Sequence, residues 1–313
     1  MYKISDFDMS KIEIYNYSKP NPGLNYNEFT AYCRTQKKVI LDDYILRKLN
    51  EFYIYSNKGF YVDEVIEKEY YKLVHSYFVK DYDCNYVIDV KDKENFIEIE
   101  NDVEQEMKKI NAEPCYIITP LSDLYLKRDK VFKKDKYEEI NKEVWQVFEN
   151  FNNLEDIESN CKMKIKLEKS TDMIKLAQIT LDAFNTGDSE DPYESLDEGY
   201  LKMYENYKGT NGTKYNRDFY FIKANEKIVG VTTAVYDDRI YGIYGIAILK
   251  EFRGKGIGTE CLKQQLMICK KKNRKMAFLQ TEEGYYPAKL YRKIGFKDVC
   301  TAYYYVKKDW CFM

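Results

Sequence analysis

The stretch from Ala247 to Thr259 constrains the fold more than any other part of the chain. It reads Ala-Ile-Leu-Lys-Glu-Phe-Arg-Gly-Lys-Gly-Ile-Gly-Thr, an apolar strand that runs into a turn and then a helix. The turn contains Gly254, Gly256 and Gly258, which leave the backbone unshielded by side chains and permit positive φ angles. Consecutive N–H groups can therefore converge at the positive end of the helix dipole. The pattern predicts a binding site for an anion such as a diphosphate.

Other nucleotide-binding loops fit this turn less well. A phosphate-binding loop of the Walker type needs Gly-Lys followed by Ser or Thr, whereas here a glycine follows Lys255. A Rossmann interpretation is weaker because we find no acidic residue at a strand end at the spacing that holds a ribose.

A second motif makes the glycine turn more specific. Arg253, Gly256 and Gly258 form an RxxGxG pattern, and residues 288–296 then read Ala-Lys-Leu-Tyr-Arg-Lys-Ile-Gly-Phe. The two motifs together resemble the GNAT (Gcn5-related N-acetyltransferase) family, whose members carry acetyl-CoA on an RxxGxG/A loop and close with an AxxLYxxxGF segment. The resemblance covers roughly residues 162–306. It implies an α/β domain with a mixed sheet that binds an acyl-CoA.

The second half of the chain shows the alternation of strands and helices that suits this family. Apolar periodicity and turn residues predict the elements, and Ser170 is the predicted N-cap of the first helix. The predicted strands cover residues 162–167, 218–224, 228–236, 240–249, 275–281 and 299–307. The predicted helices are one that follows Ser170 and buries a stripe from Ile174 to Phe184, one over residues 193–207, one that follows the glycine turn and ends at 270–272, and one from Pro287 that ends at a left-handed cap at Gly295.

The first half repeats part of this order. We predict a helix over residues 102–111, a strand over 115–119, a helix over 121–127 and a strand over 139–148, with no glycine-rich turn before the first helix. Two interpretations stay open: a degenerate GNAT-like copy that cannot hold the cofactor, and an unrelated α/β domain. The polar stretch near residue 158 predicts two domains, residues 1–158 and 159–313.

The resemblance also implies which residues hold acetyl-CoA. Backbone groups of a splayed strand would pair with the pantetheine arm, and the glycine turn would hold the diphosphate, with the side chains of Arg253 and Lys255 adding charge. The family often places Asn where this chain has Tyr285, which leaves the contact there in question. The implied cofactor-binding residues are Ile246, Ala247, Ile248, Arg253, Gly254, Lys255, Gly256, Ile257, Gly258, Thr259 and Tyr285.

Acetyl transfer also needs acid and base chemistry. By resemblance, the hydroxyl of Tyr291 approaches the thioester sulfur and acts as the general acid; the alternative is a tyrosine packed on the core. Glu282 and Glu283 follow a predicted strand and are candidates for the base, although paired acids there also suit a solvated surface. An acidic stretch within residues 182–198 would border the acceptor cleft and attract a cationic amine, or would be an ordinary charged loop.

Composition narrows the remaining classes of function. The net charge of −2 provides no general field for nucleic acid or an anionic membrane. The eight cysteines form no CxxC pair and His75 is the single histidine, so we expect no metal site and no histidine-dependent nucleophile. The N-terminal Met-Tyr-Lys-Ile-Ser-Asp has no apolar core segment and the sequence has no uninterrupted run of about eighteen apolar residues, so we expect neither secretion nor membrane spanning. The thiols suit a reducing compartment. We expect a cytoplasmic protein.

These patterns together predict an acetyl-CoA-dependent N-acetyltransferase. The amine of an acceptor, which we expect to be a small molecule, would attack the thioester directly, without a metal. The alternative is a module that binds CoA without turnover and acts in regulation or interaction. Two features favour that alternative: Tyr285 stands where the family often has Asn, and no general base is obvious.

Overall fold

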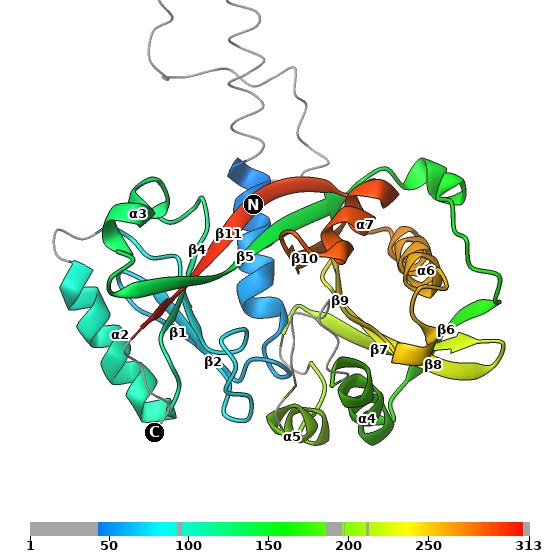
Figure 1. The fold of residues 1–313 in the computed structure, drawn as a ribbon, viewed down its shortest axis with the longest axis horizontal. Coiled ribbons are helices and arrows are strands. Elements are labelled where there is room, and N and C mark those ends of the chain that lie inside the picture. The colour runs from blue at the N-terminus through cyan, green and yellow to red at the C-terminus, as the bar shows by residue number, and fades with distance from the viewer. Residues whose placement is uncertain (1–42, 93–95, 186–195, 197, 211–212, 309–313) are drawn as a thin grey trace, which may run out of the picture. The chain divides into compact units, whose positions relative to one another are not determined.

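The computed structural model describes residues 43–92, 96–185, 196, 198–210 and 213–308 (Figure 1). The chain divides into two compact units, Met1–Ile45 and Leu46–Met313. The elements described below belong to the second unit, in which residues 46–56 form the first helical segment.

Within the described residues, the strands of this unit form one mixed sheet in the order β1-β2-β3-β4-β11-β5-β10-β9-β8-β7-β6. The strands are β1 (Glu64–Glu67), β2 (Lys72–His75), β3 (Tyr86–Ile88), β4 (Cys115–Ile118), β5 (Tyr137–Phe148), β6 (Ile165–Ser170), β7 (Asn216–Ala224), β8 (Lys227–Tyr236), β9 (Ile240–Ile248), β10 (Met276–Glu282) and β11 (Lys297–Lys307). The helices are α2 (Phe96–Ile110), η3 (Tyr125–Lys127), α3 (Arg128–Val131), η4 (Phe151–Asp156), α4 (Met173–Phe184), α5 (Gly199–Glu205), η5 (Lys250–Phe252), α6 (Ile257–Lys271) and α7 (Tyr286–Ile294).

The two longest strands exchange places between the halves of the unit. β5 comes from the first half but pairs with β10, and β11 comes from the second half but pairs with β4. β5 and β11 also pair with each other, and Figure 1 shows them side by side through the middle of the unit. Each half therefore completes its part of the sheet with a strand from the other half.

The prediction that the first half repeats the order of strands and helices of the second half is confirmed. The first half runs β3, α2, β4, η3 with α3, and β5, and the second half runs β9, α6, β10, α7 and β11. In both halves the first and third of these elements are parallel neighbours. The predicted boundaries need two corrections. α2 begins at Phe96 rather than 102, and the helix predicted over 121–127 is a 3₁₀ turn followed by the short α3.

Two predictions at the start of the second half also need correction. The N-cap of α4 is Asp172, whose carboxylate accepts a hydrogen bond from the N–H of Lys175 at 3.1 Å, whereas Ser170 ends β6. α5 begins at Gly199, and residues 193–195 and 197 of the helix predicted over 193–207 lie outside the described residues. The C-terminal cap of α7 is as predicted, because Gly295 has φ 112°.

Helices cover both faces of the second half of the sheet. Phe219 and Phe221 of β7 pack in one core with α4, and the intervening Tyr220 packs in another core with α6. Likewise Tyr241 of β9 bonds to α6, whereas the adjacent Gly242 lies against Phe52 of the first helical segment. Side chains alternate between faces along a strand. The first helical segment and α4 therefore cover one face, and α6 covers the other.

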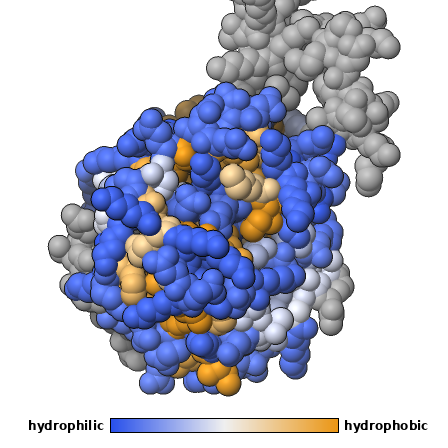
Figure 2. All heavy atoms as spheres, turned by 90° about the vertical axis from the view of Figure 1, so that its right-hand side faces the viewer, coloured by the Kyte–Doolittle hydropathy of each residue, from blue (hydrophilic) through white to orange (hydrophobic). Residues whose placement is uncertain are grey.

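Figure 2 shows the end of the molecule near β6, where hydrophilic residues predominate and apolar ones lie between them. Throughout the part of the chain that the structure describes, no helix combines the length and apolar character needed to cross a membrane.

Candidate active site

β9 and β10 separate part of the way along their length. Their parallel register runs from Ile240 opposite Met276 to Gly242 opposite Phe278, and stops there. β9 continues to Ile248 without β10 as a partner, so its backbone groups on that side face an opening in the sheet. The predicted splay at residues 246–248 lies within this opening, which begins earlier, at Gly242.

A β-bulge bends β9 inside the opening. Tyr244 pairs with Thr233 and Ala247 pairs with Val231, so two residues of β9 lie opposite one residue of β8. Gly245 is one of the two and has φ 54°. A bulge increases the local twist and redirects a strand, and glycine accommodates the positive φ. Gly245 within an otherwise strand-like pattern is a sequence signal for such a bend.

The glycine turn follows β9 and leads directly into α6. Gly254 and Gly256 have φ 71° and 76°, and Gly256 is the N-cap of α6 without a side-chain hydrogen bond. A Cβ built on Gly254 or Gly258 would meet nothing within 4 Å. The first N–H groups of a helix have no partners within the helix, so they are available to a bound anion. The turn has the open backbone that a diphosphate requires.

Gly256 has a different role from its two neighbours. Its Cβ would lie 2.3 Å from Oδ1 of Asn160 and 2.8 Å from the backbone nitrogen of Cys161. Residues 160–161 therefore support the turn from behind, and both the positive φ and this close approach require glycine.

The charged side chains of the turn contact the protein itself. Arg253 donates from Nε to the carbonyl of Ile248 at 3.0 Å and from Nη2 to the carbonyl of Ala183. Lys255 donates from Nζ to the carbonyl of Glu251 at 2.7 Å. Arg253 thereby links β9 to α4, and the charge that the two side chains would add near the phosphates stays a prediction.

Tyr291 lies on α7, on the same face of the sheet as α6. Its ring contacts Phe296 at a centroid distance of 6.0 Å, and its hydroxyl makes no hydrogen bond with the described residues. Burial raises the pKa of Tyr291, and the nearby Cys261 adds to the rise. The phenol therefore stays protonated at neutral pH and can donate a proton. Tyr285, half-buried and in extended backbone, is the N-cap of the same helix.

The two predicted base candidates differ sharply in their surroundings. Glu283 is exposed and accepts a hydrogen bond from Nη2 of Arg292 at 2.6 Å. Glu282 ends β10 and lies directly opposite Glu143 of β5 in the antiparallel register. Burial raises the pKa of Glu282. Glu282 is thus the better placed of the two to accept a proton, because a cation already neutralises Glu283.

Glu143 is a candidate functional residue that sequence reasoning missed. The hydroxyl of Tyr304 donates to its Oε2 at 2.5 Å, and the hydroxyl of Tyr53 lies 3.1 Å from that of Tyr304. Burial raises the pKa of Glu143 to about 7, against the hydrogen bond from Tyr304 and together with the charge of Glu282. A carboxylate with a pKa near neutrality suits a general base. Only the exchange of β5 brings it beside β10, so no local pattern indicated it.

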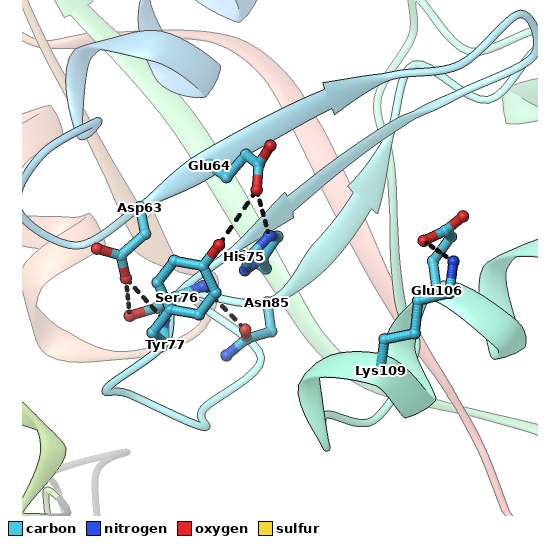
Figure 3. A network of polar contacts seen from close by, with 8 residues as sticks. All are labelled: Asp63, Glu64, His75, Ser76, Tyr77, Asn85, Glu106 and Lys109. Atoms are coloured by element: carbon cyan, nitrogen blue, oxygen red, sulfur yellow. Dashed lines mark hydrogen bonds and ion pairs between the residues drawn. The ribbon is translucent and has the colours of Figure 1, made fainter.

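A third acid, Asp83, belongs to the loop between β2 and β3. Burial raises its pKa well above the usual range, and Glu143 is the largest of the charges that add to this rise. Asn85 fixes the loop: its Oδ1 accepts from the N–H of Ser76 at 3.0 Å, and its Nδ2 donates to the carbonyl of Val79 at 2.8 Å. Figure 3 shows the contact of Asn85 with Ser76 near His75, whose Nε2 lies 3.3 Å from a Glu64 carboxylate oxygen.

The face that holds Glu143 also carries several buried polar atoms without partners. Trp145 and Gln280 are paired across β5 and β10, two residues from the Glu143–Glu282 pair. The atoms without a hydrogen bond within the described residues include Nε1 of Trp145, Nε2 of Gln280, Oδ1 of Asn141, Oγ of Ser56 and the hydroxyl of Tyr244. Three of them adjoin one another, because the side chains of Ser56 and Gln280 lower the pKa of Tyr244. Buried polar atoms usually have a partner, so Nε1 of Trp145 and Oδ1 of Asn141 are the two that call for a water or a ligand atom. Among the described residues, no three His, Cys, Asp or Glu side chains are placed to hold a metal ion.

The comparisons with known proteins agree with this geometry. Residues 176–296 match the model of the Acetyltransferase (GNAT) family. The second half of the chain therefore contains a GNAT domain. Searching the curated proteins by sequence returned no match.

Solved structures resemble both halves together. A functionally unknown conserved protein from Staphylococcus epidermidis has a TM-score of 0.56 at 16% identity, with 79% of this chain and 94% of that chain covered. A GCN5-related N-acetyltransferase from Kribbella flavida has a TM-score of 0.53 at 12% identity, with coverage of 79% and 90%. A tandem GNAT protein from the clavulanic acid biosynthesis pathway has a TM-score of 0.51 at 10% identity, with coverage of 75% and 77%. At these identities the likeness concerns the fold, which consists of two GNAT-like domains.

Proposed function

We propose that this protein is an acetyl-CoA-dependent N-acetyltransferase that acts on the primary amine of a small molecule. The observation that carries the proposal is the open glycine turn at the start of α6, which follows directly from the strand that borders the opening in the sheet. A long thioester cofactor needs both features, an anion site for its diphosphate and a passage for its acyl arm.

The cofactor would extend from the turn into the opening. Main-chain N–H groups of residues 254–259 hold the diphosphate, and the unpaired backbone of Ile246, Ala247 and Ile248 bonds to the pantetheine arm. Tyr285 borders the arm from the start of α7. These groups bind and orient the thioester, so its carbonyl reaches the face that carries Glu143.

The reaction is a direct transfer with one proton taken up and one released. The neutral amine nitrogen attacks the thioester carbonyl carbon, and the carbon–sulfur bond then breaks to give an amide and a thiolate. Glu143, together with Glu282, accepts the proton that the amine loses. Tyr291 donates a proton to the departing sulfur from the other face of the sheet, and solvent restores its proton.

Gly258 allows a sharp test of the anion site. Its φ is not positive and a side chain there would meet nothing, so Gly258→Asp and Gly258→Asn should both fold. An added carboxylate at a helix N-terminus stabilises the helix but repels a diphosphate. We expect Gly258→Asp to weaken acetyl-CoA binding at least about 100-fold, and Gly258→Asn much less. Calorimetric titration measures both, and unchanged affinity in Gly258→Asp would refute the site.

The same preparation separates an enzyme from a binding module. Protein, acetyl-CoA and a panel of primary amines are incubated while free thiol is followed. Amine-dependent release of thiol supports the transferase. Tight binding of acetyl-CoA without release for any amine would instead favour a module that binds CoA in regulation or interaction.

A further inference from the structure

Arg217, on β7, is a buried cation whose hydrogen bonds are incomplete. Its side chain is only 8% exposed. Nη2 donates to the carbonyl of Ser56 at 3.1 Å and to Oδ1 of Asn57 at 3.0 Å. Nε and Nη1 have no hydrogen-bond partner within the described residues. The nitrogens that carry three of the five guanidinium N–H groups are therefore left without acceptors among the described residues.

The surroundings of Arg217 are aromatic rather than acidic. The guanidinium lies 4.6 Å from the ring centroid of Phe60 and 5.8 Å from that of Tyr61. Burial lowers the pKa of Arg217, and the groups that oppose this are tyrosines, not carboxylates. Rings attract a cation but do not neutralise it. A buried charge without a counter-ion is costly, so the site is suited to an anion that the described residues do not supply.

Arg217 lies beside the opening in the sheet. Tyr61, whose ring it approaches, has its hydroxyl 3.7 Å from the Cβ position of Gly245 in the bulge of β9. Tyr244 precedes Gly245 in β9. Burial raises the pKa of its hydroxyl, the neighbouring side chains of Ser56 and Gln280 and the charge of Arg217 lower it, and the charge of Glu143 raises it. Tyr244 thus lies within reach of a cation and of an acid.

This arrangement extends the proposed function to the class of its acceptor. We propose that the acceptor is an amino-acid-like zwitterion, whose carboxylate binds Nε or Nη1 of Arg217 and whose amine lies toward Glu143 and Glu282. The inference rests on the proposed function for the transfer itself, but the carboxylate site stands on the geometry of Arg217. The separation of charges across Tyr244 matches a molecule that carries both signs.

A carboxylate fits this site better than a phosphate. A guanidinium pairs well with either anion. However, among the residues that the structure describes, Arg217 is the single cation that affects the pKa values of Tyr61, Tyr204, Tyr207 and Tyr244. One positive charge balances a monoanion and leaves a phosphate dianion half-neutralised.

The experiment compares free amino acids with their primary amides in the full chain. Amidation removes the anion and keeps the amine. With wild-type protein and acetyl-CoA, we expect thiol release at a kcat/KM at least about tenfold higher for the best free acids than for their amides, the lower range for one charge-assisted hydrogen bond. Amides that work as well as the acids would overturn the inference and leave the transferase intact.

Binding without the cofactor gives an independent measurement. Free amino acids at millimolar concentration should raise the unfolding midpoint of the apo protein, and the amides should raise it less. A shift equal for acids and amides, or absent for both, would contradict the carboxylate site. If no amine releases thiol yet the acids bind selectively, the proposed function fails and the anion site is supported.

Variants then assign the effect to Arg217. Arg217→Gln should lower kcat/KM for the acids at least about tenfold and leave the amides within about twofold. Arg128→Gln is the matched control, because Arg128 also bonds a carbonyl, lies over a ring and has an unpartnered Nε, but belongs to the first half. Equal losses for acids and amides in Arg217→Gln would indicate a structural role. If Arg217→Gln does not fold, the comparison of acids with amides in the wild type decides.

Discussion

The two halves of the sheet share one order of elements but differ in what they do with the space between parallel strands. In the second half, β9 and β10 separate and expose backbone groups beside an open glycine turn. In the first half, β3 and β4 share one register pair, Val87 opposite Tyr116, and aromatic rings fill the region. Tyr116 contacts Phe96, Phe132 and Tyr137 at centroid distances of 5.8, 5.4 and 6.0 Å.

This difference teaches that strand order alone does not make a cofactor site. The connection before α2 reads Asp-Val-Lys-Asp-Lys-Glu-Asn over residues 89–95 and contains no glycine. Side chains at every position of that connection would shield its backbone from a diphosphate. The first half supplies β5, with Glu143, to the second half. It supports the site rather than repeating it.

The largest expected effect tests whether the halves can exist apart. Residues 159–313 alone would lack β5, which is the partner of both β10 and β11. Each strand would lose a ladder of hydrogen bonds and expose an edge. We expect this fragment to show no cooperative thermal unfolding, and coexpression with residues 1–158 to restore it. A cooperative transition in the fragment alone would show that the proposed domains at 1–158 and 159–313 are independent.

The next effect concerns the glycine turn, which the first half lacks. Gly256→Val places a branched side chain at φ 76° and against Asn160. We expect the turn to rearrange and acetyl-CoA affinity to fall at least about 100-fold, measured by calorimetric titration. Gly258→Ala is the control, because its Cβ meets nothing within 4 Å. Wild-type affinity in Gly256→Val would mean that the turn does not hold the cofactor.

Substitution of Glu143 tests whether the first half contributes the general base. Its pKa of about 7 predicts that kcat/KM rises with pH up to about 7, where the carboxylate becomes deprotonated. Glu143→Gln should lower kcat/KM by about 10³-fold and remove this limb of the pH profile. Glu283→Gln, which removes an acid already paired with Arg292, should change little. Activity that keeps its pH limb in Glu143→Gln would exclude Glu143 as the base.

Substitution of Tyr291 tests the general acid proposed on the other face of the sheet. Tyr291→Phe removes the proton donor but keeps the ring packed against Phe296, so we expect turnover to fall about 10²-fold with acetyl-CoA affinity retained. Tyr286→Phe is a suitable control because Tyr286 is 66% exposed on the same helix. Unaltered turnover in Tyr291→Phe would remove it as the acid.

The smallest effect is on stability. Because the pKa of Glu143 is raised from 4.5 to about 7, the folded state binds this proton more tightly than the unfolded state. Its contribution is present below about pH 4.5 and is lost as pH rises through about 7. Glu143→Gln should therefore gain stability over the wild type in urea unfolding as pH rises from about 4.5 to above 7, and the two should be similar at low pH. An equal difference at both pH values would contradict the buried carboxylate.

The sequence by itself determined the local parts of this protein. The glycine turn, the helix after it, the cap at Gly295 and most strands of the second half follow from residue spacing, because turns and periodicity act over a few neighbouring residues. The repeat of elements in the first half was also readable. The bounds of α2 and of the segment after β4 were not, since packing extended one and shortened the other.

Only the tertiary structure decided how these parts combine. The exchange of β5 and β11, the meeting of Glu143 with Glu282, and the buried Arg217 beside the bulge of β9 join residues far apart in the chain. Hydrogen-bond ladders between distant strands set these neighbours, and no local spacing encodes them. The glycine turn is a property of one segment, whereas the neighbours of Glu143 and Arg217 are a property of the assembled sheet.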